Sequence, residues 1–276
     1  NYDSLRDNPD VDAVFIVLPN ALHAEYTVRA AQAGKHVLCE KPMATTPEDC
    51  QRMIDACRSA NRKLMIAYRV RYEPYNQTMI AWSRAKKYGD VQFVLSDTIM
   101  DVGGAKQWRL DPALSGGGSL IDVGIYSLNA TRYLTGEEPA EINALSYTNP
   151  KESRFSKVEE SIAFQLRFPS GVLANCTSSY GTAQVNRYRV VGQKGWHGLE
   201  PATLYRGLQL WHGHDDVVER VHLPEVNHVA KEMDHFAGCV FEDKTPLTPG
   251  EEGLKDVRLI LKIYEAAKAR ETLRVT

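Results

Sequence analysis

Two short stretches of the chain carry side chains that can bind a polar ligand and handle protons. The first is Glu40-Lys41, which follows the apolar run Val37–Cys39, and the second places Asp122 and Tyr126 one helical turn apart. An apolar run of this kind is typical of a buried parallel strand, so the carboxylate and ammonium are expected where that strand ends. The proline that follows lacks a backbone N–H and restricts the lysine, which favours a defined turn. The alternative is an ordinary strand-end turn with a solvated ion pair.

The second stretch begins with a run of glycines, Gly116–Gly118, and continues through Ser119 into an apolar segment. Ser119 is predicted to cap a helix, and Asp122, three residues later, would complete a capping box. In this structural interpretation Tyr126 is a half-buried aromatic residue. In the functional interpretation the glycines let the backbone approach a ligand closely, and Asp122 and Tyr126 are presented to it. The pattern alone leaves both interpretations open.

Before residue 90 the chain alternates between apolar and amphipathic segments. The predicted elements, strand before helix in each pair, are Val11–Leu18, His23–Ala33, Val37–Cys39, Pro47–Ala60, Lys63–Tyr68 and Tyr75–Tyr88. Such alternation implies right-handed crossovers and a parallel sheet. The polar strand ends Pro19-Asn20, Glu40-Lys41 and Tyr68-Arg69 therefore fall on one edge, where α/β folds bind ligands.

The strand predicted over Val11–Leu18 is apolar enough for the centre of a sheet, yet little precedes it that could pair with it. The chain also contains no GxGxxG phosphate-binding motif. We expect that the beginning of a nucleotide-binding domain, and with it any signal peptide, lies outside this sequence.

After Gly89-Asp90 the pattern changes to strands of alternating polarity, with two helices at the end of the chain. The predicted strands are Val91–Asp97, Ala140–Tyr147, Glu159–Phe168, Gly171–Ser179 and Arg187–Val191, and the helices are Val226–Glu242 and Glu251–Arg270. This arrangement predicts an α+β domain over residues 90–276, with a mostly antiparallel, open-faced sheet, after an α/β domain over 1–89. A sheet open on one face needs a cover, and a partner subunit is expected to supply it.

Composition excludes several classes of function. The net charge of -2 and the absence of a basic block argue against nucleic-acid binding. No apolar run approaches the roughly 20 residues that span a bilayer. The five cysteines form no CxxC pair, which favours a reducing compartment. His212 to Asp216 resembles a metal-ligand cluster, but a hairpin between strands explains it better, so no metal is expected.

The stretch Cys39-Glu40-Lys41-Pro42, together with Leu18–His23, resembles the glucose–fructose oxidoreductase/inositol dehydrogenase/MocA (Gfo/Idh/MocA) family. The resemblance spans nearly the whole chain and is weakest over Gly195–Val229. It is greatest to the glucose–fructose oxidoreductase branch, on the motifs Glu40–Thr46, Gln107–Leu110, Gly116–Tyr126 and Pro249–Ile260.

The resemblance implies a Rossmann-type dinucleotide-binding domain and a role for particular residues. Lys41, Asp122 and Tyr126 match catalytic positions, and most members have histidine where Tyr126 stands, whereas the glucose–fructose oxidoreductase branch has tyrosine. The expected cofactor-binding residues are Leu18, Pro19, Asn20, His23, Glu40, Lys41, Arg69, Trp108, Arg109 and Tyr205. The expected substrate-binding residues are Lys41, Tyr72, Asp122 and Tyr126. The same branch implies NADP, with NAD as the alternative.

The side chains suit this chemistry. Oxidation of a sugar hydroxyl needs a base for the O–H proton and an acceptor for the hydride. A free phenol is a poor base at neutral pH, but a nearby ammonium stabilises the phenolate, so a Lys41–Tyr126 pair across a domain cleft is expected. Asp122, one turn earlier, can orient the sugar by hydrogen bonding.

The sequence therefore predicts an NADP-dependent sugar oxidoreductase that oxidises a cyclic aldose at C1 to a lactone, with coupled reduction of a second sugar as a further expectation. The alternatives are an inositol or trans-dihydrodiol dehydrogenase, and a non-catalytic dinucleotide- or sugar-binding regulator of the same fold. We expect a homo-dimer or homo-tetramer that binds no nucleic acid or membrane. A cytoplasmic location is expected, with a periplasmic one as the alternative.

Overall fold

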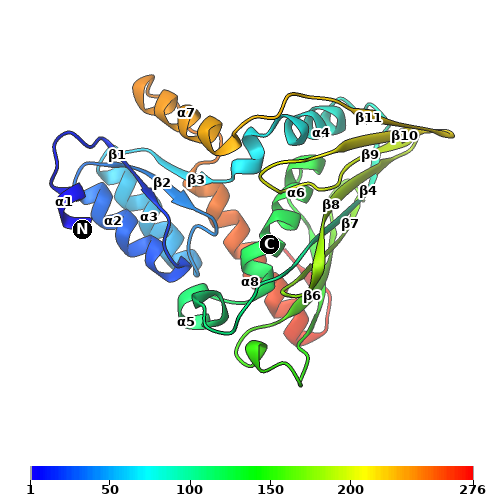
Figure 1. Ribbon diagram of the computed structural model, residues 1–276, viewed down its shortest axis with the longest axis horizontal. Coiled ribbons are helices and arrows are strands. Elements are labelled where there is room, and N and C mark those ends of the chain that lie inside the picture. The colour runs from blue at the N-terminus through cyan, green and yellow to red at the C-terminus, as the bar shows by residue number, and fades with distance from the viewer. Residues whose placement is uncertain (1, 276) are drawn as a thin grey trace.

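The computed structural model describes residues 2–275 and places two β-sheets at an angle to each other, with helices between them (Figure 1). The elements of the first part of the chain are α1 (Tyr2–Arg6), β1 (Ala13–Ile16), α2 (His23–Gln32), β2 (His36–Glu40), α3 (Pro47–Ser59), β3 (Leu64–Ala67) and α4 (Pro74–Arg84). Each predicted strand and helix of this part is therefore present, with its ends within four residues of the predicted limits.

The first sheet has the order β1-β2-β3 and is parallel, as predicted. Parallel pairing aligns the ends of β2 and β3, because Glu40 pairs with Ala67. Helices α2 and α3 begin at the predicted residues, and α4 begins one residue before its predicted start. Thr46 caps α3 by accepting a hydrogen bond from Asp49 N at 3.2 Å. Within residues 2–275, β1 pairs with β2 alone and is an edge strand, whereas its apolar sequence predicts a central one.

The second sheet is built mainly by the later elements. They are β4 (Val91–Asp101), α5 (Pro112–Ser115), α6 (Ile125–Thr135), β5 (Glu141–Tyr147), β6 (Ser161–Arg167), β7 (Leu173–Ser179), β8 (Gly181–Gly192), β9 (Gly195–Leu199), β10 (Leu210–His214), β11 (Val217–Val221), α7 (His228–Phe241), α8 (Gly250–Ala269) and β12 (Leu273–Arg274). The nine strands have the order β11-β10-β9-β8-β4-β7-β6-β5-β12. Only the β4–β7 pair is parallel, so the prediction of a mostly antiparallel sheet is confirmed.

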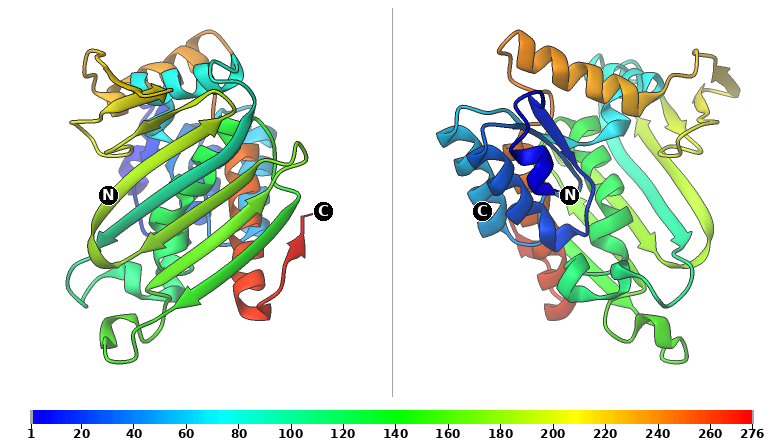
Figure 2. Two further views of the ribbon diagram at one scale, coloured as in Figure 1. Left: turned by 90° about the vertical axis from the view of Figure 1, so that its right-hand side faces the viewer. Right: turned by 60° about the vertical axis from the view of Figure 1, so that its left-hand side comes forward.

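One face of this sheet is covered by α6 and α8, and the other carries no helix in the described part of the chain (Figure 2). Alternation along β6 explains the arrangement, because its apolar residues Ile162, Phe164 and Leu166 are buried while the residues between them are exposed. The uncovered face bears large exposed side chains, among them Leu145 and Tyr147.

The last long helix, α8, joins the two sheets. It packs on α3 and β3 on one side and on β5 on the other. Its first turn approaches the end of β2 so closely that a Cβ on Gly253 would lie 2.8 Å from Met43 Cβ. Just before the helix, Thr248 O accepts a hydrogen bond from Ile66 N on β3, and the Thr248 hydroxyl donates to Ile66 O. The two sheets are therefore held together by a segment about 180 residues beyond the first sheet.

Candidate active site

The ends of β2 and of the segment leading into α6 meet at a buried ion pair. Lys41, directly after β2, donates to the Asp122 backbone oxygen at 2.6 Å and to its Oδ1 at 3.1 Å. Both side chains are nearly buried, at 11% and 12% exposed. Burial alone would lower the pKa of Lys41, but the Asp122 carboxylate raises it above its usual value, so the lysine stays charged.

Asp122 collects three donors from three parts of the chain. Besides Lys41, its Oδ2 accepts from Arg109 Nε at 3.0 Å and from the Tyr180 hydroxyl at 2.7 Å. Burial would raise the pKa of Asp122, but Lys41 and Arg109 lower it to about 2. Asp122 is therefore an anion that fixes two cations and a phenol around one carboxylate.

The backbone around Asp122 differs from the predicted capping box. Ser119 has helical backbone angles and no capping hydrogen bond, and Leu120–Gly124 forms a π-helical turn that runs into α6. The capping box is therefore wrong, because the Asp122 carboxylate turns away from the helix start to bind Lys41, Arg109 and Tyr180. Single π-turns inserted before α-helices occur often at functional sites.

The glycine run before this turn serves packing within the protein. A Cβ on Gly117 would lie 2.3 Å from the Tyr264 hydroxyl, and one on Gly118 would lie 2.1 Å from Glu159 O. None of the three glycines lines the pocket described below. These contacts favour the structural interpretation of the glycine run.

Tyr126, one turn beyond Asp122, faces two cations. Lys41 Nζ lies 4.8 Å from the centre of its ring, and in the described part of the chain no hydrogen bond joins the two side chains. Arg69, from the turn that follows β3, places Nη2 3.4 Å from the Tyr126 hydroxyl. The expected Lys41–Tyr126 pair is thus a cation–ring contact, while Arg69, predicted only as a cofactor contact, approaches the hydroxyl itself.

These groups line a pocket of about 440 Å³ between the two sheets. Of the residues predicted from the sequence it contains Leu18, Asn20, Glu40, Lys41, Arg69, Trp108, Arg109, Asp122, Tyr126 and Tyr205. Its volume is typical of small-molecule sites. The three strand ends of the first sheet thus converge with the start of α6, as the parallel order predicts.

Three predicted residues lie outside this pocket lining. His23 is fully buried behind the strand ends, with Nδ1 2.9 Å from Pro42 O and Nε2 2.8 Å from Leu18 O, and therefore braces the two loops. Pro19 precedes the turn that carries Asn20. Tyr72 is buried in a separate apolar cluster against Phe236, so the structure does not place it where a substrate in the pocket could reach it.

Several residues of the site gave no recognisable sequence signal. Tyr180 follows β7 as an isolated aromatic residue, and only the fold brings it to Asp122. Asn186, on β8, accepts hydrogen bonds from Ala202 N and Thr203 N at 2.8 and 2.6 Å. It thereby shapes the loop that presents Tyr205, whose ring stacks 3.9 Å from the Arg69 guanidinium.

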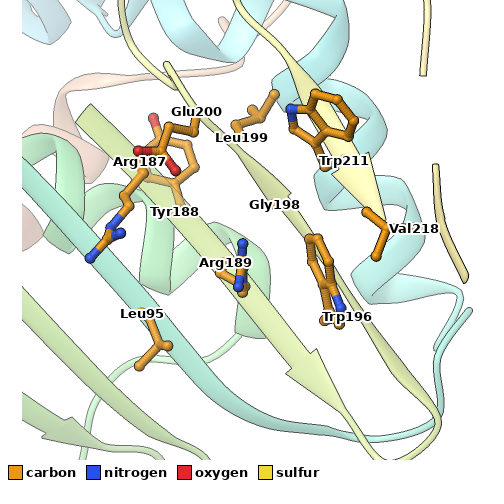
Figure 3. A pocket seen from close by; sticks show the side chains of 10 residues that line it. All are labelled: Leu95, Arg187, Tyr188, Arg189, Trp196, Gly198, Leu199, Glu200, Trp211 and Val218. Atoms are coloured by element: carbon orange, nitrogen blue, oxygen red, sulfur yellow. The ribbon is translucent and has the colours of Figure 1, made fainter. Parts of the chain in front are cut away.

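A second cavity, of about 650 Å³, lies on the uncovered face of the second sheet (Figure 3). Trp196, Trp211 and Arg189 project into it from neighbouring strands, and Arg189 stacks on Trp196 at 4.1 Å. The cavity is lined by β4, β8, β9, β10 and β11 and shares none of the Lys41–Asp122–Tyr126 cluster. It is a feature of the open face and not part of the candidate active site.

Two further findings bear on the predicted classes. Among residues 2–275 no group of three or more His, Cys, Asp or Glu is placed to hold a metal ion. His212 and His214 lie on β10 of the β10–β11 hairpin, as the hairpin interpretation predicts. No helix in the described range is long and apolar enough to cross a membrane.

An α/β unit whose strand ends face a cation-lined pocket, closed by an α+β unit, is the arrangement of a two-domain dinucleotide-dependent enzyme. Family models identify it further. Residues 1–68 match the oxidoreductase family with an NAD-binding Rossmann fold, and residues 76–197 match the GFO/IDH/MocA C-terminal domain. The chain belongs to the GFO/IDH/MocA oxidoreductase family.

Individual relatives agree with this assignment. The chain is 36% identical to D-xylose 1-dehydrogenase [NADP(+)] of Haloarcula marismortui, over 96% of this chain and 74% of that protein. It is 32% identical to D-xylose 1-dehydrogenase (NADP(+)) 2 of Haloferax volcanii, over 97% and 82%. The aldose-aldose oxidoreductase of Caulobacter crescentus, solved with glycerol, superposes with a TM-score of 0.95 at 47% identity, over 99% and 82% of the two chains.

Proposed function

We propose that the chain is an NADP-dependent oxidoreductase that oxidises a cyclic aldose at C1 to the lactone, with Tyr126 as the base. The single observation that carries this proposal is the cluster at the pocket, where the Tyr126 phenol faces Lys41 and Arg69 beside the Asp122 carboxylate. The similarity to NADP-dependent xylose dehydrogenases and to an aldose-aldose oxidoreductase supports the choice of sugar and cofactor.

The pocket suits a dinucleotide by its charge and its shape. Three cations, Lys41, Arg69 and Arg109, line it against two carboxylates, Glu40 and Asp122, which leaves an excess of positive charge for an anionic ligand. Trp108 and the exposed ring of Tyr205 offer apolar surfaces from the second unit for a planar ring. Leu18, Asn20, Glu40 and Arg69 would hold the cofactor along the strand ends.

In the proposed reaction, Tyr126 takes the proton of the sugar O1 hydroxyl as the C1–O bond becomes a carbonyl. NADP, when bound, supplies the acceptor for the hydride that leaves C1. Lys41 and Arg69 stabilise the charge on the phenolate before the proton arrives. Asp122 holds Lys41 and Arg109 in place and can accept a hydrogen bond from a sugar hydroxyl. In the reverse direction the Tyr126 hydroxyl returns the proton to a carbonyl oxygen, which permits coupled reduction of a second sugar.

The direct test is Tyr126→Phe, which removes the proton acceptor and keeps the ring. We expect turnover of D-xylose or D-glucose with NADP to fall by roughly 10²–10⁴, while NADPH binding, followed by fluorescence, stays near wild type. Tyr133→Phe is the matched control, because Tyr133 lies on the same helix and its buried hydroxyl has no partner within residues 2–275. Equal turnover in the two variants would remove Tyr126 from the mechanism.

The same assay separates the alternatives. A non-catalytic regulator would bind NADPH without changing nicotinamide absorbance on any sugar. An inositol or trans-dihydrodiol dehydrogenase would act on those alcohols in preference to aldoses. Coupled oxidation and reduction predicts that cofactor stays with the purified protein, which mass spectrometry of the native protein measures.

Assembly and organisation belong to the same proposal. The uncovered face of the second sheet, with exposed Phe93, Leu95, Leu145, Tyr147 and Leu173, is expected to be covered by another subunit in a dimer or tetramer. Such an interface would bury on the order of 1,600 Å² or more, and light scattering at micromolar concentration tests it. The division at residues 89/90 and the cytoplasmic location stay predictions.

A further inference from the structure

Helix α7 brings two buried polar side chains to the back of the candidate active site, and none of the roles described above uses them. His228 is 2% exposed and Glu232 is 1% exposed, and neither lines the pocket. They lie four residues apart, so their side chains share one face of the helix. Within residues 2–275, His228 Nδ1 and Glu232 Oε1 are both buried without a hydrogen-bond partner.

The other nitrogen of His228 contacts Arg69, because Nε2 lies 3.3 Å from Arg69 Nη1. A guanidinium can only donate, so Nε2 must accept and the proton of the neutral ring must be on Nδ1. Burial, together with Arg69, lowers the pKa of His228 to about 4, which keeps the ring neutral at physiological pH. The unpartnered Nδ1–H of His228 is therefore a donor, and the unpartnered Oε1 of Glu232, one helical turn later, is an acceptor.

Several groups fix the position of the Arg69 guanidinium, and one of its nitrogens also lies near the Tyr126 hydroxyl. Its Nη2 donates to Thr203 O at 2.7 Å and lies 3.4 Å from the Tyr126 hydroxyl. The Tyr205 ring covers its face at 3.9 Å. A separation of 3.4 Å is long for a hydrogen bond to a neutral phenol, but bonds to an ionised oxygen are shorter and about twice as strong.

We propose that Glu232 and His228 are positioning residues which, as a hydrogen-bonded chain from α7, orient the Arg69 guanidinium toward the Tyr126 oxygen, and that Arg69 stabilises the phenolate directly. This inference rests on the proposed function, in which Tyr126 takes the substrate proton. In this proposal His228 Nδ1 donates to Glu232, directly or through one bridging water, since i, i+4 side chains are neighbours on a helix. Helix α7 then contributes to catalysis without touching the ligand.

The buried surroundings of the Glu232 carboxyl are consistent with a hydrogen bond from His228. Burial and the Glu40 carboxylate raise its pKa to about 8, while Arg69 opposes the rise. An unpaired carboxyl this buried is unfavourable for stability unless a donor reaches it. The chain from Glu232 through His228 to Arg69 supplies that donor.

The test compares His228→Gln, whose side-chain oxygen can accept from Arg69 as Nε2 does, with His228→Met, which keeps bulk and removes the acceptor. With NADP and D-xylose, His228→Met should lower kcat by roughly 10- to 100-fold, the effect of one hydrogen bond to a charged group. KM for D-xylose should stay within about twofold, because neither residue of α7 lines the pocket. His228→Gln should recover most of kcat. His235→Met is the control on the same helix, since His235 accepts from Leu247 N at 3.0 Å, far from Arg69.

A readout without turnover is NMR of tyrosine labelled at the ring carbon that bears the hydroxyl, with the Tyr126 signal assigned by its loss in Tyr126→Phe. Within residues 2–275, Lys41, Arg69 and Tyr188 face Tyr126, and Asp122 lines the same pocket. With all four retained, the signal of the labelled Tyr126 carbon at a fixed pH should differ between His228→Met and wild type, because Arg69 is no longer oriented toward the Tyr126 oxygen.

Several outcomes would overturn the inference. One is an unchanged kcat in His228→Met. Another is an equal loss of kcat in His228→Met, His228→Gln and His235→Met, which would show a general effect on the stability of α7. If His228→Met does not fold, Glu232→Gln replaces it, with an expected loss of kcat of about fivefold or more, and unchanged kcat there overturns the chain. A full rate in Tyr126→Phe would instead overturn the proposed function, whereas an inactive Tyr126→Phe beside a wild-type His228→Met would overturn only the role of α7.

Discussion

Within residues 2–275, two buried ion clusters are alike in composition and differ in whether they line the pocket. Around Asp122, Lys41 and Arg109 meet one carboxylate at the pocket. Between α6 and α8, Arg132 meets Asp256 at 2.6 Å, with 2% and 0% of the two side chains exposed.

The cluster around Arg132 is bonded only to other protein side chains and does not line the pocket. Its guanidinium also donates to Glu138 at 2.6 Å and to Glu252 at 3.0 Å, and Asp256 accepts a further bond from Asn129 at 2.8 Å. Each partner stays within the protein, so the cluster fastens α8 to α6. The Asp122 cluster instead lies beside a cavity and a phenol that faces it. Burial of charge alone therefore does not mark an active site, while charges arranged around a cavity do.

The largest expected effect tests the Arg132 cluster. Arg132→Met leaves Asp256 buried without its cation and should lower the free energy of unfolding by about 3–5 kcal/mol, the range for breaking a buried pair. Denaturant unfolding measures it, and the turnover per folded molecule should be unchanged. Lys262→Met, which breaks a solvent-exposed pair with Glu265, should change stability by less than about 1 kcal/mol. A loss of turnover in folded Arg132→Met would contradict a purely structural role for the Arg132 cluster.

The next effect concerns the Asp122 cluster. Lys41→Met removes the ammonium over the Tyr126 ring, so turnover should fall by roughly 10²-fold and the remaining activity should move to higher pH. A pH profile of kcat measures both. The double variant with Tyr126→Phe should be little worse than the worse single one, because the two residues act as a unit. A silent Tyr126→Phe with an inactive Lys41→Met would transfer the role of base to Lys41.

The smallest effect is a pH dependence of stability. Lys41 and Arg109 oppose burial and lower the pKa of Asp122 from 3.8 to about 2. A lowered folded-state pKa contributes stability that is present above pH 3.8 and is lost as the pH falls through about 2. The advantage of wild type over Asp122→Asn in unfolding free energy should therefore shrink by about 2 kcal/mol between neutral pH and pH 2. A constant difference over this range would show that Asp122 is not held as an anion by the two cations.

Much of the site could be predicted because it depends on strand order. Glu40-Lys41 and Arg69 each follow a strand, and parallel pairing brings such ends to one edge whatever lies between them. The Asp122–Tyr126 spacing places both side chains on one side of a helical segment. The capping box was wrong because an N-cap motif takes only local backbone donors into account. The Asp122 carboxylate instead accepts from Lys41, Arg109 and Tyr180, which lie far away in the sequence or outside the helix.

The sequence by itself determined the elements, their alternation, the location of Lys41 at a strand end and of Tyr126 on a helix, since these follow from local periodicity and turn chemistry. Tertiary structure alone decided which groups touch. Tyr180 reaches Asp122 from 58 residues away, and His228 reaches Arg69 from 159 residues away. Such contacts depend on how α7, α8 and the second sheet pack against the strand ends. That packing is set by the burial of a whole core, which no local pattern encodes.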